Sequence, residues 1–437
     1  MRASAPSVRD CVSTVLVVGV AALLGACSSH TVRMVDTTQP KQLGNIREEM
    51  LLDVGVAVFD ANVPIAFDDQ VAQNIAPDVR RAEANYMAFF TKSLLQSTGN
   101  WGAVRVVPRP THAVDVMVTG NIVHSDGERM ILATQVRDAR GDVWLANTYE
   151  SLASKYAYGD TVPPGIDPFQ SIYRRLADDM LAYLQTLDPS EVDAIRRTAE
   201  MKFASDLSPD AFQSYVVQTE PGKFEIRRLP AENDPMLQRI RKVREREYIF
   251  IDTLDTYYDD FHLRMYPAYQ GWRAATYDEA IAYRNQREKV RRQTLAGVVA
   301  ITAGSAAQMG DKTLTRYAGA VSIIGGARTA IQAIQSLDRA RAHASMLREL
   351  GISAEAAITP HTIELENRTH RLDGTVTAQY DELRQVLRRI YYEELGLPPP
   401  ADDGFEQATA DAEAAGEALT EVVGATADPV TMAEGAK

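Results

Sequence analysis

Residues 53–59 constrain the fold more than any other segment, because they predict a β-strand that is apolar on both faces. They read Asp-Val-Gly-Val-Ala-Val-Phe, which places the valines on one face and glycine, alanine and phenylalanine on the other. A strand of this kind is typical of a sheet that is covered on both sides. The chain is therefore expected to contain a layered α/β domain.

Strand and helix signals alternate from residue 51 to residue 187. One helix is predicted to begin at Pro77 and to end at Gly99-Asn100, and another to begin at Asp167-Pro168. Strands are predicted over residues 104–107, 114–122, 130–137 and 143–150. A five-residue turn with a glycine joins the last two strands into a hairpin. We therefore expect an α/β sandwich domain over residues 49–187.

Four short segments in this region carry a resemblance to known periplasmic domains. They are Asp53–Asp60, Val104–Pro108, Ala113–Gly120 and Gly141–Trp144. With the order of elements, these segments make the region similar to the periplasmic domain of the curli-secretion lipoprotein. The region also resembles the lipoprotein activators of penicillin-binding proteins and the TolB amino-terminal domain. The two membrane-crossing hairpins of the curli channel have no counterpart here, so the resemblance does not imply a secretion pore.

The first 27 residues predict where the protein is located. Arg2 and Arg9 precede an apolar stretch of about 14 residues, which is too short to span a bilayer and typical of a signal peptide. The stretch ends in Leu24-Gly25-Ala26-Cys27, which resembles a bacterial lipobox and implies a lipid on Cys27. Ser28 stands where this family places Asp for inner-membrane retention, so the resemblance implies an outer-membrane lipoprotein facing the periplasm. An ordinary signal peptide that contains a cysteine is the alternative.

These signals divide the beginning of the chain into residues 1–26, a signal peptide, and residues 27–48, a lipidated tether. Since the chain has two cysteines and Cys11 leaves with the signal peptide, the mature protein is expected to have no disulfide. The formal net charge of −13 gives the chain no overall attraction to nucleic acid. Arg-rich segments around 239–246 and 284–292 are interleaved with glutamates, so they are expected to be charged helix faces with pairing along one helix. A local anionic partner is the alternative.

Residues 188–397 predict a mainly α-helical domain, so the expected fold class is α+β. Helices are expected over 189–206 and 209–217, followed by a proline-rich loop and a long helix from about 236 to 265. A last helix has heptad spacing and is expected to pack on the preceding helices. Its seam residues are Leu365, Thr369, Leu372, Val376, Gln379, Leu383, Val386 and Ile390. Residues 398–437, with nine acidic residues and one lysine, predict a disordered acidic tail.

Aromatic residues are concentrated between Tyr248 and Tyr283, where ten occur in 36 positions. Aromatics at helical spacing usually pack in a core, whereas Tyr and Trp are also favoured at binding hot spots. Both readings are open. The candidates for a partner surface are Tyr257, Tyr258, Tyr266, Tyr269 and Trp272.

Residues 295–334 predict a hairpin of two Gly/Ala-rich helices. Small residues four positions apart allow a second helix to approach closely. They are Ala296, Ala300, Gly304, Ala318, Ser322, Gly326 and Ala330. Internal packing, a contact between copies of a homo-oligomer and a membrane-inserting hairpin are all consistent with this spacing. The arms are short for membrane insertion, which requires about 20 apolar residues.

Catalytic motifs are absent from the sequence, which has no HExxH, GxSxG, SxxK, Walker A or GxGxxG pattern. One acidic cluster, Asp252, Asp255, Asp259 and His262, shares a helix face. The spacing of Asp259 and His262 is that of metal ligands in helix bundles, for which Glu366 and His370 would be the second pair. We expect a solvated acidic face instead, and no metal or cofactor.

The sequence as a whole predicts a non-enzymatic, lipid-anchored protein of the outer membrane that acts as an interaction or assembly factor among envelope proteins. The alternative is an oligomeric membrane-perturbing or export component that uses the hairpin of residues 295–334. A hydrolase whose site has no recognised motif is a third hypothesis.

Overall fold

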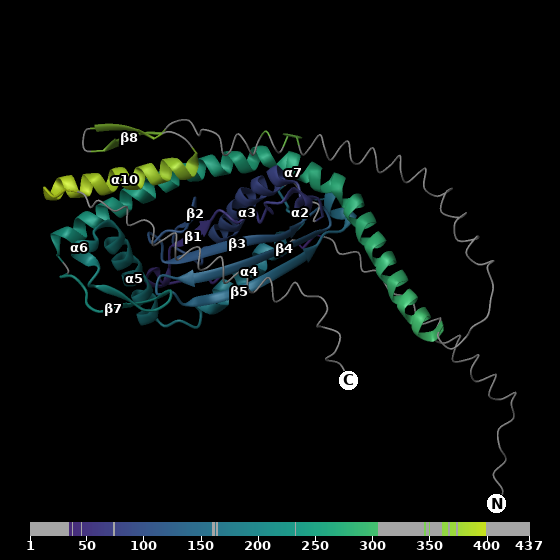
Figure 1. Ribbon diagram of the computed structural model, residues 1–437. Coiled ribbons are helices and arrows are strands. Elements are labelled where there is room, and N and C mark those ends of the chain that lie inside the picture. The colour runs from purple at the N-terminus through teal and green to yellow at the C-terminus, as the bar shows by residue number, and fades with distance from the viewer. Residues whose placement is uncertain are drawn as a thin grey trace, which may run out of the picture. The chain divides into compact units, whose positions relative to one another are not determined.

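A five-stranded mixed sheet lies at the centre of the fold (Figure 1). The structure, a computed structural model, describes residues 35–398 except 37, 45, 73–74, 160–161, 163–164, 232, 305–344, 347–348, 350–360, 366–367 and 373–374. The strands are β1 (Val54–Ala57), β2 (Val104–Val107), β3 (Val116–Ser125), β4 (Arg129–Asp138) and β5 (Val143–Leu152). Their order is β2-β1-β3-β4-β5, with β1 parallel to β2 and β3 and the remaining pairs antiparallel. All five strands are at the positions predicted from the sequence.

Helices and two separate hairpins complete the described chain, which confirms the α+β class. The helices are α2 (Phe67–Ala72), α3 (Pro77–Ser97), α4 (Gln170–Leu184), α5 (Pro189–Leu207), α6 (Pro209–Phe212), α7 (Pro235–Gly304) and α10 (Val376–Leu395). Two 3-10 turns are η1 (Glu48–Met50) and η2 (Lys155–Tyr158). The hairpins pair β6 (Val216–Glu220) with β7 (Lys223–Ile226), and β8 (His361–Leu365) with β9 (Arg368–Leu372).

Helices α3 and α4 pack together on one face of the sheet. The side chains of β3 alternate accordingly, since Val116, Val118 and Ile122 are fully buried, whereas Met117 and Thr119 on the opposite face are partly exposed. Strand β1 is buried along its whole length, as its apolar residues on both faces predict.

The hairpin β6–β7 replaces the loop predicted around residues 217–235. Its turn contains Gly222, which has a φ of 73°, and the amide of Phe224 donates to the carbonyl of Arg140 at 2.9 Å. A Cβ atom on Gly141, whose φ is 87°, would lie 1.6 Å from the carbonyl oxygen of Gly222. The hairpin is therefore fixed by backbone contact with the β4–β5 turn, a long-range contact that no local pattern could indicate.

The heptad seam is correct in its second half and wrong in its first. Val376, Gln379, Leu383, Val386 and Ile390 are buried in α10, which packs on α7 as expected. Leu365, Thr369 and Leu372, however, lie in strands β8 and β9. Thr375 caps the N-terminus of α10 by accepting a hydrogen bond from the amide of Ala378 at 3.2 Å, so the helix begins where a cap is present.

Helix α7 is continuous over 70 residues, which corresponds to about 105 Å at 1.5 Å per residue. Its predicted end near residue 265 is wrong, although Pro267 removes one backbone donor. Packing on both sides of Pro267 stabilises the continuous helix, because Met265 and Tyr269 are fully buried. A Cβ atom on Gly127 would lie 2.0 Å from the carbonyl oxygen of Arg273, so the β3–β4 turn lies directly against the α7 backbone.

The predicted division between residues 187 and 188 does not separate two packing units. Helix α7 contacts α3 and the edge strand β2, and two ion pairs connect them. Arg105 of β2 lies 2.6 Å from Asp252, and Lys92 of α3 lies 2.5 Å from Asp255. The described residues from Val35 onward belong to one compact unit.

The predicted tether of residues 27–48 is partly wrong, because its second half is built into this unit. Arg174 of α4 lies 2.9 Å from the carboxylate of Asp36. The amide of Lys41 donates to Asp178 at 2.8 Å, and the amide of Leu43 donates to Asn100 at 2.9 Å. Residues 35–43 therefore lie along α4 and the end of α3.

A fully buried ion pair joins α7 to the loop before α4. Nη1 of Arg273 lies 2.7 Å from Oδ2 of Asp167, and both side chains are 0% exposed. The hydroxyl of Tyr86 donates to the same Asp167 oxygen at 3.0 Å, and the amide of Phe169 donates to the other at 2.8 Å. The Arg273 guanidinium stacks 3.7 Å from the ring centroid of Tyr269. Each charge thus has a counter-ion in direct contact, as a buried pair requires.

Replacing Arg273 with Met should lower the free energy of unfolding by about 3–5 kcal/mol, because the Asp167 carboxylate would stay buried without its counter-ion. Adding Asp167→Asn removes that charge and keeps an acceptor for the amide of Phe169, so the double variant should recover part of the loss. Arg264→Met is the matched control on the same helix, since Arg264 pairs with Asp260 at the surface and such pairs contribute about 0–1 kcal/mol. Urea unfolding measures all three. Equal losses for the Arg273 and Arg264 variants would contradict this account.

Replacing Arg174 with Ala should expose the segment around Lys41 to proteolysis, since it removes the bond between α4 and Asp36. We expect cleavage by Lys-C after Lys41 to become several-fold faster, because local opening controls cleavage of a docked segment. Arg175→Ala is the control, as Arg175 bonds to Ser171 and Glu150 instead. Mass spectrometry of the digest gives the rate at this bond. An unchanged rate would mean that residues 35–43 are not held by these contacts.

Candidate functional site

A hollow of about 850 Å³ lies among α5, α7 and the starts of β1 and β3. We call it the charged hollow, because its lining includes eight charged side chains of mixed sign. They are Arg196, Arg197, Arg241, Arg244, Asp53, Asp115, Asp193 and Glu200. Asp53 and Asp115 come just before two neighbouring parallel strands, which brings them to the same edge of the sheet. A volume of this size is typical of ligand-binding clefts.

The charges of the hollow are paired across elements. Arg241 of α7 makes two bonds to Glu200 of α5, at 2.5 and 3.2 Å. Arg244 donates to the carbonyl of Ala113 at 2.8 Å and lies 3.7 Å from the carboxylate of Asp115. The sequence predicts pairing along one helix for these arginines, whereas their partners are distant in sequence. The hollow therefore presents alternating positive and negative groups.

Asp115 is the most buried acid of the hollow. Burial raises its pKa, while the nearby charge of Arg244 and a hydrogen bond from the amide of Asp53 lower it. That bond is 2.9 Å long, so Asp115 also holds the start of β1. The lining of the hollow contains no His, Cys, Ser or Thr. The carboxylates and guanidinium groups of the lining are suited to binding polar and charged groups.

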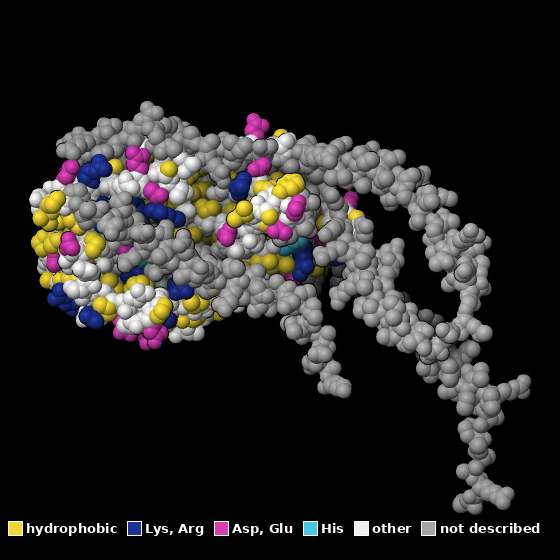
Figure 2. Space-filling view, in the orientation of Figure 1, with side chains coloured by type: hydrophobic (Ala, Val, Ile, Leu, Met, Phe, Trp, Pro, Cys, Tyr) yellow, Lys and Arg dark blue, Asp and Glu magenta, His cyan; other side chains and the backbone are white. Residues whose placement is uncertain are grey.

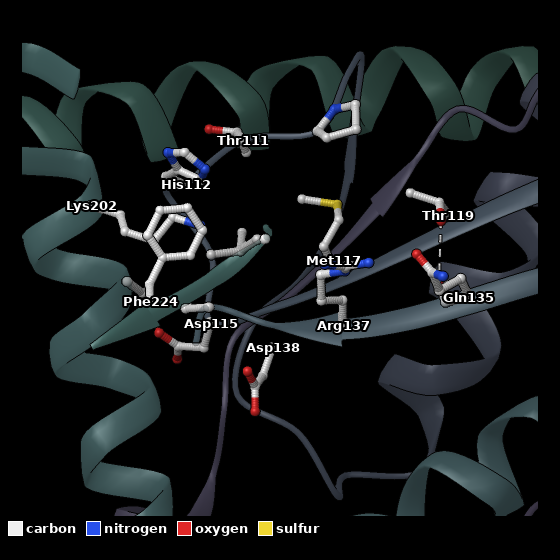
Figure 3. Close-up of a pocket in the computed structure, with 15 residues that line it drawn as sticks. Thr111, His112, Asp115, Met117, Thr119, Gln135, Arg137, Asp138, Lys202 and Phe224 are labelled. Atoms are coloured by element: carbon white, nitrogen blue, oxygen red, sulfur yellow. Dashed lines mark hydrogen bonds between the residues drawn. The ribbon is translucent and has the colours of Figure 1, made fainter. Parts of the chain in front are cut away.

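A second cavity, of about 80 Å³, lies among β3, β4, α5 and β7 (Figure 3). We call it the Arg137 pocket. Arg137 of β4 and Met117 of β3 are direct register partners at its floor. On its α5 side, Nζ of Lys202 lies 3.7 Å from the ring centroid of Phe224. The pocket thus combines basic groups with an apolar wall.

The rim of the Arg137 pocket is tied to α5 and α10. Nδ1 of His112 lies 2.6 Å from Asp206 of α5, and Arg384 of α10 lies 3.9 Å from the same carboxylate. In the same loop, the hydroxyl of Thr111 donates to Glu247 of α7 at 3.4 Å. These contacts fix the loop that precedes β3. Across the described part of the face in Figure 2, basic and acidic side chains are interspersed.

The acidic cluster predicted on α7 is in part an interface and not a wholly solvated face. Asp252 and Asp255 pair with Arg105 and Lys92, as described above. His262 is packed among aromatic rings, 4.6 Å from the ring centroid of Tyr86. Glu366 lies outside the described residues. Within the described part of the chain, no three His, Cys, Asp or Glu side chains are grouped closely enough to hold a metal ion.

The aromatic run on α7 is mainly core. Tyr258, Tyr269 and Trp272 are 3%, 0% and 9% exposed, so the prediction of a partner surface is wrong for these three rings. These three rings of α7 belong to the hydrophobic core, where other parts of the chain cover them. Tyr257 and Tyr266 are partly buried, and the hydroxyl of Tyr266 donates to the carbonyl of Ile166 at 3.3 Å.

The Gly/Ala-rich positions are described only in part. Ala296, Ala300 and Gly304 belong to the last turns of α7, which agrees with the predicted first arm. Ala318, Ser322, Gly326, Ala330 and Cys27 lie outside the described residues, as does the tail of residues 399–437. Among the helices described, none has both the length and the apolar character that crossing a membrane requires.

Comparisons with known proteins add no identification. The chain has no match among protein-family models, curated proteins or solved structures. The likeness of residues 51–187 to envelope lipoprotein domains therefore stays a prediction from the sequence.

Acid should weaken the fold through His262. Burial lowers the pKa of His262, although Asp167 and Asp259 act in the opposite direction. The unfolded chain then binds this proton more readily, so stability should fall as the pH drops below about 6.5, the ordinary value for His. In His262→Gln, the free energy of unfolding should depend less on pH between 7 and 5. His124→Gln, at a side chain that is 38% exposed, serves as control. Identical pH profiles for wild type and His262→Gln would contradict this assignment.

Proposed function

We propose that the protein is a non-enzymatic interaction or assembly factor of the cell envelope, held in the outer membrane by a lipid on Cys27 and facing the periplasm. The sequence Leu24-Gly25-Ala26-Cys27 after a short apolar stretch supports the anchor. Envelope proteins are the proposed partners. The likeness of residues 51–187 to periplasmic lipoprotein domains supports the same location.

The docked N-terminal segment implies that the folded body acts close to the membrane. Val35 already packs against the core, so residues 28–34 alone link the body to Cys27. Eight residue steps span at most about 30 Å. A partner is therefore expected near the membrane surface, because this tether is too short to cross a wide compartment.

The charged hollow is the observation that carries the proposal. Its ion pairs at the surface, such as Arg241 with Glu200, are worth little individually, so a partner's polar groups can replace them at small cost. Alternating charges also select a partner of matching pattern and favour specificity over raw affinity. The carboxylates and guanidinium groups of its lining match the charged groups that such a partner would present.

An oligomeric membrane-perturbing or export component is the second candidate. One observation favours it: α7 runs without a break from the docked region into Ala296, Ala300 and Gly304. Small residues at this spacing support close helix contact. In this proposal residues 295–334 form a Gly/Ala-rich hairpin that contacts other copies or lipid.

Cys27→Ser should release the protein from membranes into the soluble periplasmic fraction, since the lipid supplies the anchor in the first candidate. Fractionation of cells, followed by a carbonate wash of the membranes, measures the distribution. Residual membrane attachment that Gly326→Asp abolishes would favour the second candidate. Attachment that survives both substitutions would contradict both candidates. A matched Gly404→Asp substitution controls for the added charge.

A further inference from the structure

Arg137 carries a charge that the described structure leaves without a carboxylate partner. Its Nε is buried and has no hydrogen-bond acceptor. Neighbouring basic side chains on this side of the sheet are paired, since Arg140 and Lys223 both bond to Asp142. Because a guanidinium cannot lose its proton in a protein, Arg137 stays charged in a confined site. An anion is the partner that such a site favours.

The two acids that line the Arg137 pocket are engaged elsewhere. Asp138 accepts hydrogen bonds from Nε1 of Trp144 at 3.1 Å and from the amide of Asp142 at 3.0 Å. Asp115 faces Arg244 and the amide of Asp53, on the side of the charged hollow. Neither acid therefore neutralises Arg137.

The pocket also offers an apolar wall beside this charge. Met117, Val114 and Phe224 line it together with Arg137, as Figure 3 shows for Met117, Phe224 and Arg137. A matching ligand should combine a carboxylate with an apolar or aromatic group. Hydrophobic contact and a charge-assisted hydrogen bond would then act together.

We propose that the chain's own C-terminal segment, Asp402-Asp403-Gly404-Phe405-Glu406, binds in the Arg137 pocket. Residues 399–437 contain nine acidic side chains, one lysine and Phe405 as their one aromatic residue. Phe405 is flanked by carboxylates on both sides, so this segment has both groups that the pocket fits. A tail whose composition predicts disorder can still dock through such a short motif.

The length of the chain allows this docking. Arg384 of α10 lies near Asp206, which also contacts His112 at the pocket rim. Leu395 is about 17 Å further along the helix from Arg384. The ten residues from Leu395 to Phe405 span up to about 35 Å, so the segment reaches back to the pocket. As part of the same chain it has an effective concentration in the millimolar range, and even a weak contact is then populated.

Disulfide trapping in the full mature chain tests this proposal. Cys11→Ser together with Cys27→Ser leaves the chain without cysteine, and Thr119→Cys places a thiol in the pocket lining. Gln407→Cys, next to the motif, should form an intramolecular disulfide several-fold faster than Thr426→Cys, which lies farther along the tail. The rate should fall several-fold in Arg137→Gln and stay high in Arg137→Lys.

Removing the negative charges of the C-terminal motif is a second test of the proposal, and it leaves the folded body unchanged. Asp402→Asn, Asp403→Asn and Glu406→Gln together should reduce the rate as much as Arg137→Gln does. Equal rates of disulfide formation for the two tail positions would overturn the proposal. Rates that change neither with the Arg137 substitutions nor with those in the motif would overturn it too. A disulfide between two chains would assign the pocket to a second copy and would likewise contradict it.

Discussion

Asp167 and Arg273 meet in the interior, where neither side chain is exposed to water and where the hydroxyl of Tyr86 bonds to the same carboxylate. This pair connects the loop before α4 with the middle of α7. The cost of leaving either charge unpaired is several kcal/mol, so the pair favours the docked position of α7. A second buried contact lies nearer the N-terminus of α7, where the hydroxyl of Tyr380 in α10 donates to Glu247 at 2.5 Å.

Because of these buried contacts, the sheet and the helices described here form one packed body and not two separate domains. Helix α7 lines the charged hollow with Arg241, Arg244 and Tyr248, while α5 and the starts of β1 and β3 supply the rest. The hollow therefore exists only because α7 is docked on the sheet. With residues 35–43 packed on α4, the proposed anchor would hold this hollow close to the membrane. A tail bound in the Arg137 pocket would lie next to the hollow, because Asp115 lines both cavities.

Local patterns predict the sheet well and the second half of the chain less well. The apolar run of β1, the glycine turn at Gly141 and the helical spacing after Pro77 each determine structure within a few residues, and all three are confirmed. Hairpin β6–β7 depends on contact with Arg140 and Gly141, about 80 residues earlier in the chain. Its sequence, with Pro221 and Gly222, otherwise resembles a loop.

Long-range pairing limits the prediction of sites for the same reason. Charge pattern alone identifies Arg241 and Arg244 as a basic helix face, but their partners Glu200 and Asp115 lie on other elements. The position of Asp53 and Asp115 before parallel strands is a signal that could have indicated a site. Aromatic spacing on α7 could not separate core from surface, because both readings predict the same helix.

Photo-cross-linking in cells tests the central claim that the charged hollow binds an envelope partner. A photoreactive residue at Leu229, which lines the hollow and is 43% exposed, is compared with one at Leu263, which is 63% exposed on α7. The account predicts one discrete cross-linked partner from position 229, little from position 263, and loss of the product in Arg241→Glu. Equal cross-linking from both positions, or a product at 229 that Arg241→Glu leaves unchanged, would contradict it.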